Sequence, residues 1–280
     1  MKFDIQRSKT FKAALSLLIG TSIMLSGSAS ASDKTLRVCA AADELPYSNK
    51  NSEGFENKLA EILAEEMDRD LEYVWSDKAA IFLVTEKLLK NECDVVMGVD
   101  KDDPRVATSI PYYKSGYAFI YPAGKGLDIK TWKSPDLKAM TKFAVVPGSP
   151  SEVMLRELDK YEGNFNYLMS LIGFKSRRNQ YVRYKPDLLI SEVASGKADI
   201  AHIWAPEAAR YVKSSPVPLE MVVSEEIAET HDGEGVLQHY DQSIAVRSED
   251  TDLLAEINTA LEKADSKIKA VLKQEGVPLL

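Results

Sequence analysis

The strongest constraint on the fold is a regular alternation of short apolar strands with amphipathic helices in the first third of the chain. Apolar, β-rich segments at 35–42, 71–75 and 93–99 predict strands. Between them, segments 56–67 and 81–91 carry apolar residues at helical spacing. The strand at 93–99 is apolar throughout, as in a parallel sheet covered on both faces. We therefore predict a β-α-β-α-β unit and the α/β fold class.

The same alternation restarts after a glycine-containing break at 123–126. Strands are predicted at 142–148, 179–184, 198–204 and 219–224, and helices at 149–161, 187–197 and 205–214. In the first of these helices Ser149 is the expected N-cap and Pro150 takes the first helical position. The chain therefore predicts two α/β lobes, each with its own sheet and right-handed crossovers.

The last quarter of the chain predicts how the first lobe is completed. Residues 225–241 are polar, broken by glycine and without periodicity, so we expect a connector between the lobes. A strand returns at 243–250, and 251–276 predicts one or two amphipathic helices with Thr251 as cap. The expected boundaries are 32–120 with 244–280 for a discontinuous first lobe, 121–243 for the second, and about 225–243 for the hinge connector.

The N-terminus has the three parts of a secretory signal peptide. Basic residues at positions 2, 7, 9 and 12 precede an apolar stretch at 13–27, and the small-residue run 29–32 follows. The apolar stretch is short and rich in serine and glycine for a membrane span, which needs about 20 apolar residues. We expect cleavage after Ala31, with an uncleaved anchor as the alternative. The chain is therefore predicted to act in the periplasm and not to be embedded in the membrane.

The charge of the chain excludes one class of partner. The whole chain carries a net charge of −8, and residues 1–31 carry +3, so the cleaved chain would carry −11. Such an acidic protein is a poor nucleic-acid binder, because phosphate contacts need clustered lysine and arginine. Long-range attraction to a basic partner fits this charge.

The two cysteines, Cys39 and Cys93, leave two interpretations open. An even number of cysteines in an oxidising compartment favours a disulfide. Its loop of about 55 residues would add ~4 kcal/mol in the chain-entropy model. The alternative is two buried thiols in adjacent strands. Either way we expect the two side chains to lie close together.

Six segments resemble the type II periplasmic solute-binding proteins across essentially the whole chain after the N-terminal segment. They read LRVCAAADELPYSN, GFENKLAEILAEE, CDVVMGV, DPRVATSIPYYKSGYAFI, VVPGSPSEVML and SGKADIAHIW. Within that superfamily the chain is most similar to the MxaJ (MoxJ) proteins encoded with bacterial methanol dehydrogenase, through AADELPYSN, GFENK and the DPRV and PYYKSGY segments. The same segments also fit the paralogue linked to the lanthanide-dependent dehydrogenase, so both branches stay open.

The resemblance implies a bilobal type II periplasmic binding protein fold, in which two crossing strands, near 117–124 and 240–246, join the lobes around a cleft. The residues that it places in or near the cleft are Glu44, Tyr47, Arg105, Tyr112, Gly148, Ser149, Ser151 and Trp204. In amino-acid-binding members, the arginine matching Arg105 pairs with the ligand carboxylate as a bidentate fork. The helix start matching Gly148, Ser149 and Ser151 supplies backbone donors to the same group.

Several departures from the amino-acid binders argue against such a ligand. Trp204 matches the position where those proteins hold the ligand ammonium with an acidic residue. Pro150 removes an N–H donor from the anion-binding loop, and Asp102 and Asp103 can pair with Arg105. A bound amino acid would bury an unpaired ammonium, at a cost of several kcal/mol. We therefore expect no tight binding of standard amino acids, and an Arg105 that lies at the cleft mouth but mainly organises its own loop.

The remaining candidates for chemistry favour structural interpretations. No nucleophile and base converge, so we do not expect an enzyme or a cofactor. His202 lies in an apolar strand and is expected in the core or the cleft wall. His231 and His239 match no metal-binding spacing. Segment 161–174 is either a buried helix of the second lobe or an exposed apolar patch for a protein partner.

These observations favour a periplasmic accessory protein of the methanol dehydrogenase system. Its partner would be the dehydrogenase, or the cytochrome c that accepts its electrons, and its role would be to bind the enzyme or help it mature. The chain has neither a haem-attachment motif nor iron–sulfur spacing, so it is not expected to carry electrons itself. The alternative is a solute receptor of an ABC transporter with a small organic ligand.

Overall fold

The computed structural model describes residues 34–172 and 184–280. The predicted signal peptide and its cleavage site lie outside the described residues. So do Phe174 and most of the strand predicted at 179–184. The described residues from Lys34 to Leu280 belong to one compact unit.

The first lobe contains a parallel sheet with one long helix packed on it. Its strands are β1 (Thr35–Ala41), β4 (Asp70–Ser76) and β5 (Val95–Asp100), with β1 between the other two. A short hairpin of β2 (Asp43–Glu44) and β3 (Ser48–Asn49) leads into α1 (Phe55–Glu66). Leu59 and Leu63 of α1 are buried in the core of this lobe, as their spacing predicts. The predicted strands and the first helix are confirmed.

The second helix of this lobe differs from its prediction. Instead of one helix at 81–91, the chain forms α2 (Leu83–Glu86) between the 3-10 turns η2 (Ala80–Phe82) and η3 (Leu88–Lys90). The backbone of Lys87 leaves the helical region, and Asn91 ends the segment in the left-handed region. Leu83, Val84 and Leu88 are all buried in one cluster beside the cysteines, so burial of the apolar residues outweighs helical regularity here.

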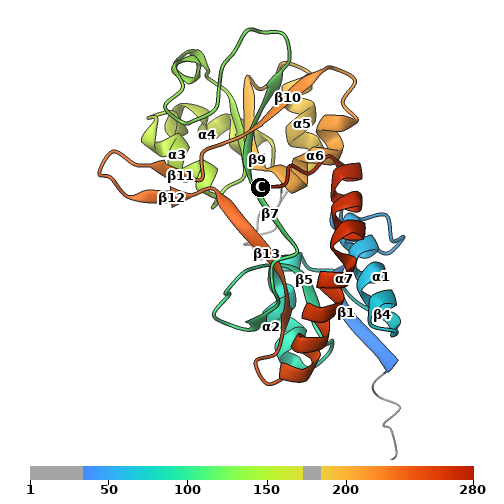
Figure 1. Ribbon diagram of the computed structural model, residues 1–280. Coiled ribbons are helices and arrows are strands. Elements are labelled where there is room, and N and C mark those ends of the chain that lie inside the picture. Colours follow the sequence, from blue (N-terminus) through green and yellow to red (C-terminus); the bar gives the residue numbers. More distant parts are fainter. Residues whose placement is uncertain (1–33, 173–183) are drawn as a thin grey trace, which may run out of the picture. The chain divides into compact units, whose positions relative to one another are not determined.

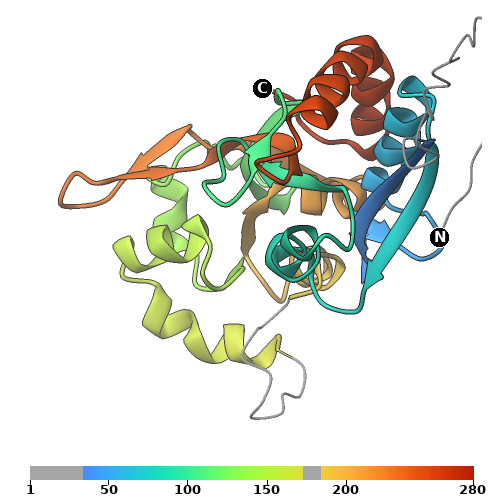
Figure 2. The ribbon, with the colours of Figure 1, turned by 90° about the horizontal axis from the view of Figure 1, so that it is seen from below.

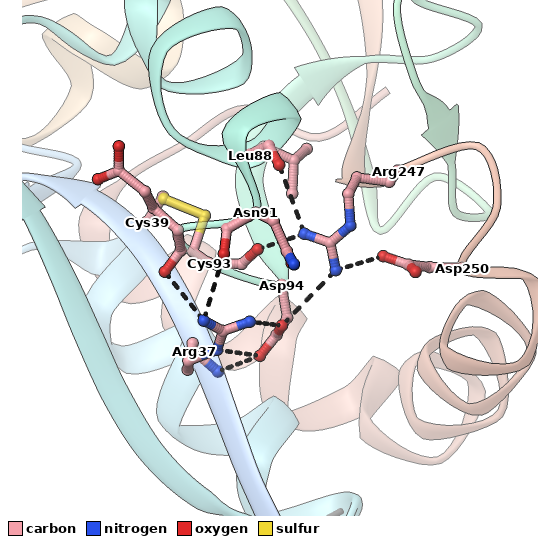
Figure 3. A network of polar contacts seen from close by, with 9 residues as sticks. Arg37, Cys39, Leu88, Asn91, Cys93, Asp94, Arg247 and Asp250 are labelled. Atoms are coloured by element: carbon pink, nitrogen blue, oxygen red, sulfur yellow. Dashed lines mark hydrogen bonds and ion pairs between the residues drawn. A yellow bond between two sulfur atoms is a disulfide. The ribbon is translucent and has the colours of Figure 1, made fainter. Parts of the chain in front are cut away.

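A disulfide and an arginine network tie three distant parts of the chain together (Figure 3). Cys39 of β1 is bonded to Cys93, two residues before β5, with 5.6 Å between the Cα atoms. Beside it, Arg37 forms a bidentate ion pair with Asp94 at 2.6 and 3.1 Å. Arg247 donates to the Cys93 carbonyl at 2.5 Å and pairs with an aspartate at the start of the last helix. The C-terminal part of the chain is thus anchored to the first lobe.

The second lobe has its own apolar core. Its strands are β8 (Phe143–Val145), β9 (Ile200–Trp204) and β10 (Leu219–Val223). Its helices are η4 (Pro135–Ala139), α3 (Pro150–Glu157), α4 (Tyr161–Ser170), α5 (Pro186–Ala194) and α6 (Ala205–Lys213). Ser149 and Pro150 take the predicted N-cap and first helical positions, although the Ser149 hydroxyl donates to the Val146 carbonyl instead of capping the helix.

Two long strands run between the lobes (Figure 1). They are β7 (Tyr113–Pro122) and β13 (His239–Val246), and the short β6 (Ala107–Thr108) pairs with β13. The first half of β7 pairs antiparallel with β13, and its second half pairs with β9 and β10. Hydrogen bonding therefore continues through a nine-stranded sheet, and the prediction of two separate sheets is wrong. The buried apolar residues still form separate cores on either side of the crossing.

The C-terminal third differs from prediction in two details. The expected connector contains a hairpin of β11 (Ile227–Glu229) and β12 (Gly235–Leu237), which projects from the second lobe (Figures 1 and 2). A single helix, α7 (Thr251–Glu275), follows with Asp250 and not Thr251 as N-cap. Its buried face packs against α1 in the first lobe. No helix within 34–172 or 184–280 combines the length and apolarity that a membrane crossing requires.

Candidate functional site

A cavity of about 600 Å³ lies where the two lobes meet the crossing strands. The first lobe contributes Tyr47, Ile81 and Asp100, and the crossing strands contribute Tyr117, Tyr240 and Gln242. The second lobe contributes the remaining lining residues: Val146, Pro147, Gly148, Ser149, Pro150, Trp204 and Glu207. This volume falls within the range of small-molecule sites in proteins.

One wall of the cavity is a cluster of three aromatic rings. Tyr117 of β7 and Trp204 of β9 are direct partners in the sheet, with ring centroids 5.7 Å apart. Tyr240 of β13 lies 5.9 Å from Trp204 and 6.3 Å from Tyr117. Since the three strands are neighbours in the order β13-β7-β9, the sheet itself holds the rings together. Trp204 is 9% exposed, so it is packed as well as accessible to the cavity.

Two carboxylates face the same space. Asp100 ends β5, and its Oδ1 accepts a hydrogen bond from Gln242 Nε2 at 2.7 Å. Glu207 lies in the first turn of α6, three residues after Trp204. Burial, followed by the charge of Glu207, raises the pKa of the Tyr117 and Tyr47 phenols, so this carboxylate acts on both. Among the described residues that line the cavity, none is lysine, arginine or histidine.

In the loop that the resemblance implies for anion binding, the backbone N–H donors already bond to acceptors of this chain. The Gly148 N–H donates to Glu152 Oε2 at 3.0 Å, and the Ser149 N–H donates to the Val146 carbonyl at 3.3 Å. Pro150 has no N–H to offer. Glu152 lies in the first turn of α3, where a negative charge also offsets the positive end of the helix dipole. A ligand carboxylate would have to displace this arrangement.

Four of the residues named from the sequence line the cavity, namely Tyr47, Gly148, Ser149 and Trp204. Trp204 lines the cavity, and so do two carboxylates that were not named from the sequence, Glu207 and Asp100. Helical spacing carried a signal for Glu207: three residues after Trp204, it falls on the same face of α6. For Asp100 the signal was its place at the end of a parallel strand, where ligand sites gather in α/β sheets.

The other four named residues do not line the cavity, and each has a partner elsewhere. Glu44 is 9% exposed and its Oε2 accepts from the Ala80 N–H at 2.6 Å. Tyr112 is buried, and its hydroxyl accepts from the Gly98 N–H at 2.9 Å. Ser151 is fully buried, 2.8 Å from His202 Nδ1.

Arg105 is the fourth, and the expectation that it lies at the cleft mouth is corrected. Its guanidinium holds the Asp103 carboxylate with Nε at 2.9 Å and Nη2 at 2.5 Å. This hydrogen bond raises the pKa of Arg105 and lowers that of Asp103. Because the partner lies only two residues away, the arginine closes its own turn and does not reach the cavity.

A second acidic group lies close to the cleft but beneath its surface. Glu56, in the first turn of α1, is half-buried, and its carboxyl lies over Gly98, where an added Cβ would come within 2.2 Å of Oε1. Burial, and then the charge of Glu44, raise the pKa of Glu56 to about 8. No positive partner of Glu56 appears in the described structure. At neutral pH this carboxyl is therefore mostly protonated and adds little negative charge to the first-lobe side of the cleft.

The histidines do not form a catalytic or metal site within the described residues. His202 is fully buried among Tyr117, Phe119 and Trp132, and burial lowers its pKa to about 3. His231 pairs with Glu157 at 2.9 Å on the surface of the second lobe. Across 34–172 and 184–280, no group of three or more histidine, cysteine, aspartate or glutamate residues has the arrangement of a metal site.

Comparison with known proteins gives one family and several close relatives. Residues 36–274 match the bacterial extracellular solute-binding proteins, family 3. The crystal structure of MxaJ from Methlophaga aminisulfidivorans MPT shares 82% identity and a TM-score of 0.85, covering 88% of this chain and 100% of that one.

Two further relatives are more distant. Protein MoxJ of Methylorubrum extorquens is 48% identical over 246 residues, which are 88% of this chain and 82% of that protein. The crystal structure of the periplasmic binding protein XoxJ from Methylobacterium extorquens AM1 shares 29% identity and a TM-score of 0.64, covering 88% of this chain and 99% of that one.

Proposed function

Because the chain belongs to the bacterial extracellular solute-binding proteins of family 3, and within them to the MxaJ and MoxJ proteins, we propose that it is a periplasmic accessory protein of methanol oxidation. In this role it binds methanol dehydrogenase, or the cytochrome c that accepts its electrons, and does not catalyse a reaction. The observation that carries the proposal is the 82% identity to MxaJ over the full length of that chain. The 29% identity to XoxJ supports the MxaJ branch over its paralogue.

The cleft supports this role over that of an amino-acid transport receptor. A receptor for amino acids needs a positive partner for the ligand carboxylate. Here Arg105 is closed on Asp103, and Gly148 is closed on Glu152. The ABC-transporter alternative is therefore the less supported of the two.

We propose the exposed face of α4 as one contact for the dehydrogenase. Asn164 and Leu168 face the core of the second lobe, while Phe165 and Met169, one helical turn apart, are 43% and 39% exposed. Exposed apolar side chains one turn apart form a continuous strip, which fits a protein partner. The buried-helix interpretation of this segment thus fits one face of α4, and the partner-patch interpretation fits the opposite face.

The proposal also fixes where the chain acts and how it is divided. We propose secretion to the periplasm with cleavage after Ala31, which N-terminal sequencing of the exported protein tests directly. We further propose the lobe boundaries 32–120 with 244–280 and 121–243. The anchoring of β13 and α7 to the first lobe through Arg247 supports the discontinuous division.

The test is affinity capture with the tagged mature protein from a periplasmic extract of methanol-grown cells. We expect recovery of methanol dehydrogenase, and reduced recovery with the double variant Phe165→Ser, Met169→Ser. The matched control is Ile227→Ser, Leu237→Ser, which removes a similarly exposed apolar pair from the β11–β12 hairpin. Absence of the dehydrogenase from the wild-type capture contradicts the proposed function. If both double variants recover equally little dehydrogenase, the role of α4 as a contact is contradicted, while the proposed function is not.

A further inference from the structure

A smaller cavity, of about 130 Å³, lies within the second lobe, where the β11–β12 hairpin meets α3 (Figure 1). Three separate segments line this second-lobe cavity: Trp132 and Lys133 before η4; Met154, Glu157 and Leu158 at the end of α3; and Glu225, Glu229, Thr230 and His231 in the first half of the hairpin and just before it. None of these nine residues lines the cavity between the lobes, so the two sites are distinct.

Of the five titratable side chains that line the second-lobe cavity, four pair with one another. Lys133 Nζ lies 2.8 Å from Glu229 Oε2, which joins the segment before η4 to β11. His231 Nδ1 lies 2.9 Å from Glu157 Oε2, and the His231 N–H donates to the same oxygen at 2.6 Å. These contacts hold the hairpin to its neighbours, and each of the four groups already has its partner.

The fifth side chain, Glu225, and the indole of Trp132 each keep one buried polar atom without a hydrogen-bond partner in the described structure. Glu225 Oε1 accepts from the Trp132 backbone N–H at 3.1 Å, which fixes the two residues beside each other, but Oε2 has no donor. Trp132 is 2% exposed, and its Nε1–H has no acceptor. Because a buried polar atom without a partner costs free energy, a bound group that pairs with both atoms is favoured.

The two atoms together select a hydroxyl group. An indole N–H is only a donor, and a carboxylate is only an acceptor. An ammonium group would pair with Glu225 but cannot accept from Trp132, whereas an anion would accept from Trp132 but be repelled by Glu225. A hydroxyl group accepts from the one and donates to the other. Met154 and Leu158 add apolar surface for an alkyl chain.

We propose that the second-lobe cavity binds a small aliphatic alcohol, whose hydroxyl pairs with Trp132 Nε1 and Glu225 Oε2 and whose chain packs on Met154 and Leu158. The volume of the cavity lies below the range of about 300–1,000 Å³ for drug-sized ligands, which limits the alcohol to a few carbon atoms. The inference goes beyond the proposed role in methanol oxidation and does not rest on it, since the contact proposed at α4 shares no residue with this cavity.

The indole N–H signals of the ¹⁵N-labelled mature protein test the inference. The chain has three tryptophans, and Trp132→Phe identifies the signal of Trp132 by its loss. Titration with 1-butanol should move that signal to saturation, while the signals of Trp75 and Trp204 shift little because neither residue lines this cavity. A Trp132 signal that stays in place leaves only water as the occupant and overturns the proposal. Three signals that drift together without saturation show a solvent effect and overturn it as well.

A series of ligands tests which part of the alcohol is recognised. From methanol to 1-butanol, affinity should rise about fourfold for each added methylene that the apolar wall buries. Diethyl ether has the molecular formula of 1-butanol but cannot donate to Glu225, and n-butylammonium has the same chain but cannot accept from Trp132. Each should bind about tenfold more weakly than 1-butanol. Equal or tighter binding of the ether shows selection by volume alone, and equal or tighter binding of the ammonium shows a cation site; either result overturns the proposal.

A matched pair of variants locates the binding. Glu225→Gln removes the charged acceptor with little change in shape and should weaken 1-butanol about tenfold. The control is Glu226→Gln, because the neighbouring carboxylate pairs with Lys114 and does not line the cavity, so this variant should bind as the wild type does. Unchanged affinity in Glu225→Gln overturns the site. If that variant does not fold, the ligand series and the Trp132 signal of the wild type still decide.

Discussion

Carboxylates meet the boundary between the lobes in two places, and their surroundings differ. At the first, Glu275 near the end of α7 is 7% exposed and is held by two bases. Arg210 of α6 lies 2.6 Å from its Oε2, and Lys58 of α1 lies 3.2 Å from its Oε1. At the second, Asp100 and Glu207 line the cavity beside aromatic rings, and no base lines it. Carboxylates are thus held by two bases in one place and lie beside aromatic rings in the other.

The difference shows that the bases bonded to a buried carboxylate, more than its place in the fold, decide whether it stabilises the protein. Burial works to raise the pKa of Glu275, but the hydrogen bonds from Arg210 and Lys58 outweigh it and lower the pKa. A group with a lowered pKa stabilises the fold above its unfolded pKa and loses that contribution in acid. The contact at Glu275 therefore holds the second-lobe helix α6 to the first lobe. Asp100, by contrast, accepts a hydrogen bond from the neutral amide of Gln242 and forms no ion pair among the described residues.

Removing the charge of Glu275 should have the largest effect on the free energy of unfolding. Glu275→Gln leaves Arg210 and Lys58 without their counter-charge in a largely buried position. We expect a loss of about 3 kcal/mol of unfolding free energy and a fall in Tm of roughly 6–12 °C at pH 7. Thermal unfolding by circular dichroism measures it, with Glu262→Gln as the exposed control. A Tm within a degree of wild type would show that this contact does not hold the lobes.

The next largest effect is the pH dependence of stability that comes from Glu56, the half-buried acid close to the cleft. The pKa of Glu56 is raised from 4.5 to about 8, so the folded protein binds its proton more tightly than the unfolded chain does. Stability from this group is present at low pH and is lost as pH rises through 8, by at most ~1.4 kcal/mol per pH unit. Charged and titratable groups facing it include Glu44, Tyr112 and Tyr113.

Glu56→Gln should remove that dependence. From pH 6 to 8, the wild type should lose about 2 kcal/mol relative to the variant. Urea unfolding at both pH values measures the difference. Parallel pH profiles for the two proteins would mean that Glu56 is ionised in the folded state, and the negative charge near the cleft would then be larger than described.

A smaller effect on stability is expected in the cavity itself. Asp100→Asn keeps the shape of the side chain and can keep the contact with Gln242, so unfolding free energy should change by less than about 1 kcal/mol. Thermal unfolding by circular dichroism measures the change. A loss of several kcal/mol of unfolding free energy would show that Asp100 stabilises the fold as Glu275 does, which would contradict the comparison.

The smallest effect is expected at Arg105. Its ion pair with Asp103 is solvent-exposed, and such pairs contribute about 0–1 kcal/mol. Arg105→Ala should therefore leave the capture of methanol dehydrogenase unchanged. A tenfold loss of captured dehydrogenase would show that this arginine contributes to function.

The fold was largely predictable from periodicity, and the cleft was predictable in part. Apolar spacing located β1, α1 and β5 because burial of one face sets that spacing. It misjudged 81–91, where three leucine and valine side chains are buried beside the disulfide only because the helix is interrupted. It also missed the β11–β12 hairpin, because strands of only three residues are too short to show an alternating pattern.

The content of the cavity could not be predicted from sequence order alone. Tyr117, Trp204 and Tyr240 come from three strands far apart in the chain, and only the pairing of β7 with β9 and β13 brings their rings together. The match of Trp204 to a family position hid Glu207, which occupies the same helix face one turn later. Arg105 was placed by resemblance, whereas its distance from the cavity follows from the local turn with Asp103.

The central claim is that the bases around a carboxylate at the lobe boundary decide whether it stabilises the fold, and thermal unfolding of Glu275→Gln beside Asp100→Asn tests it most directly. The account predicts a fall in Tm of roughly 6–12 °C for Glu275→Gln and of less than about 4 °C for Asp100→Asn. Equal falls in the two variants would contradict the claim.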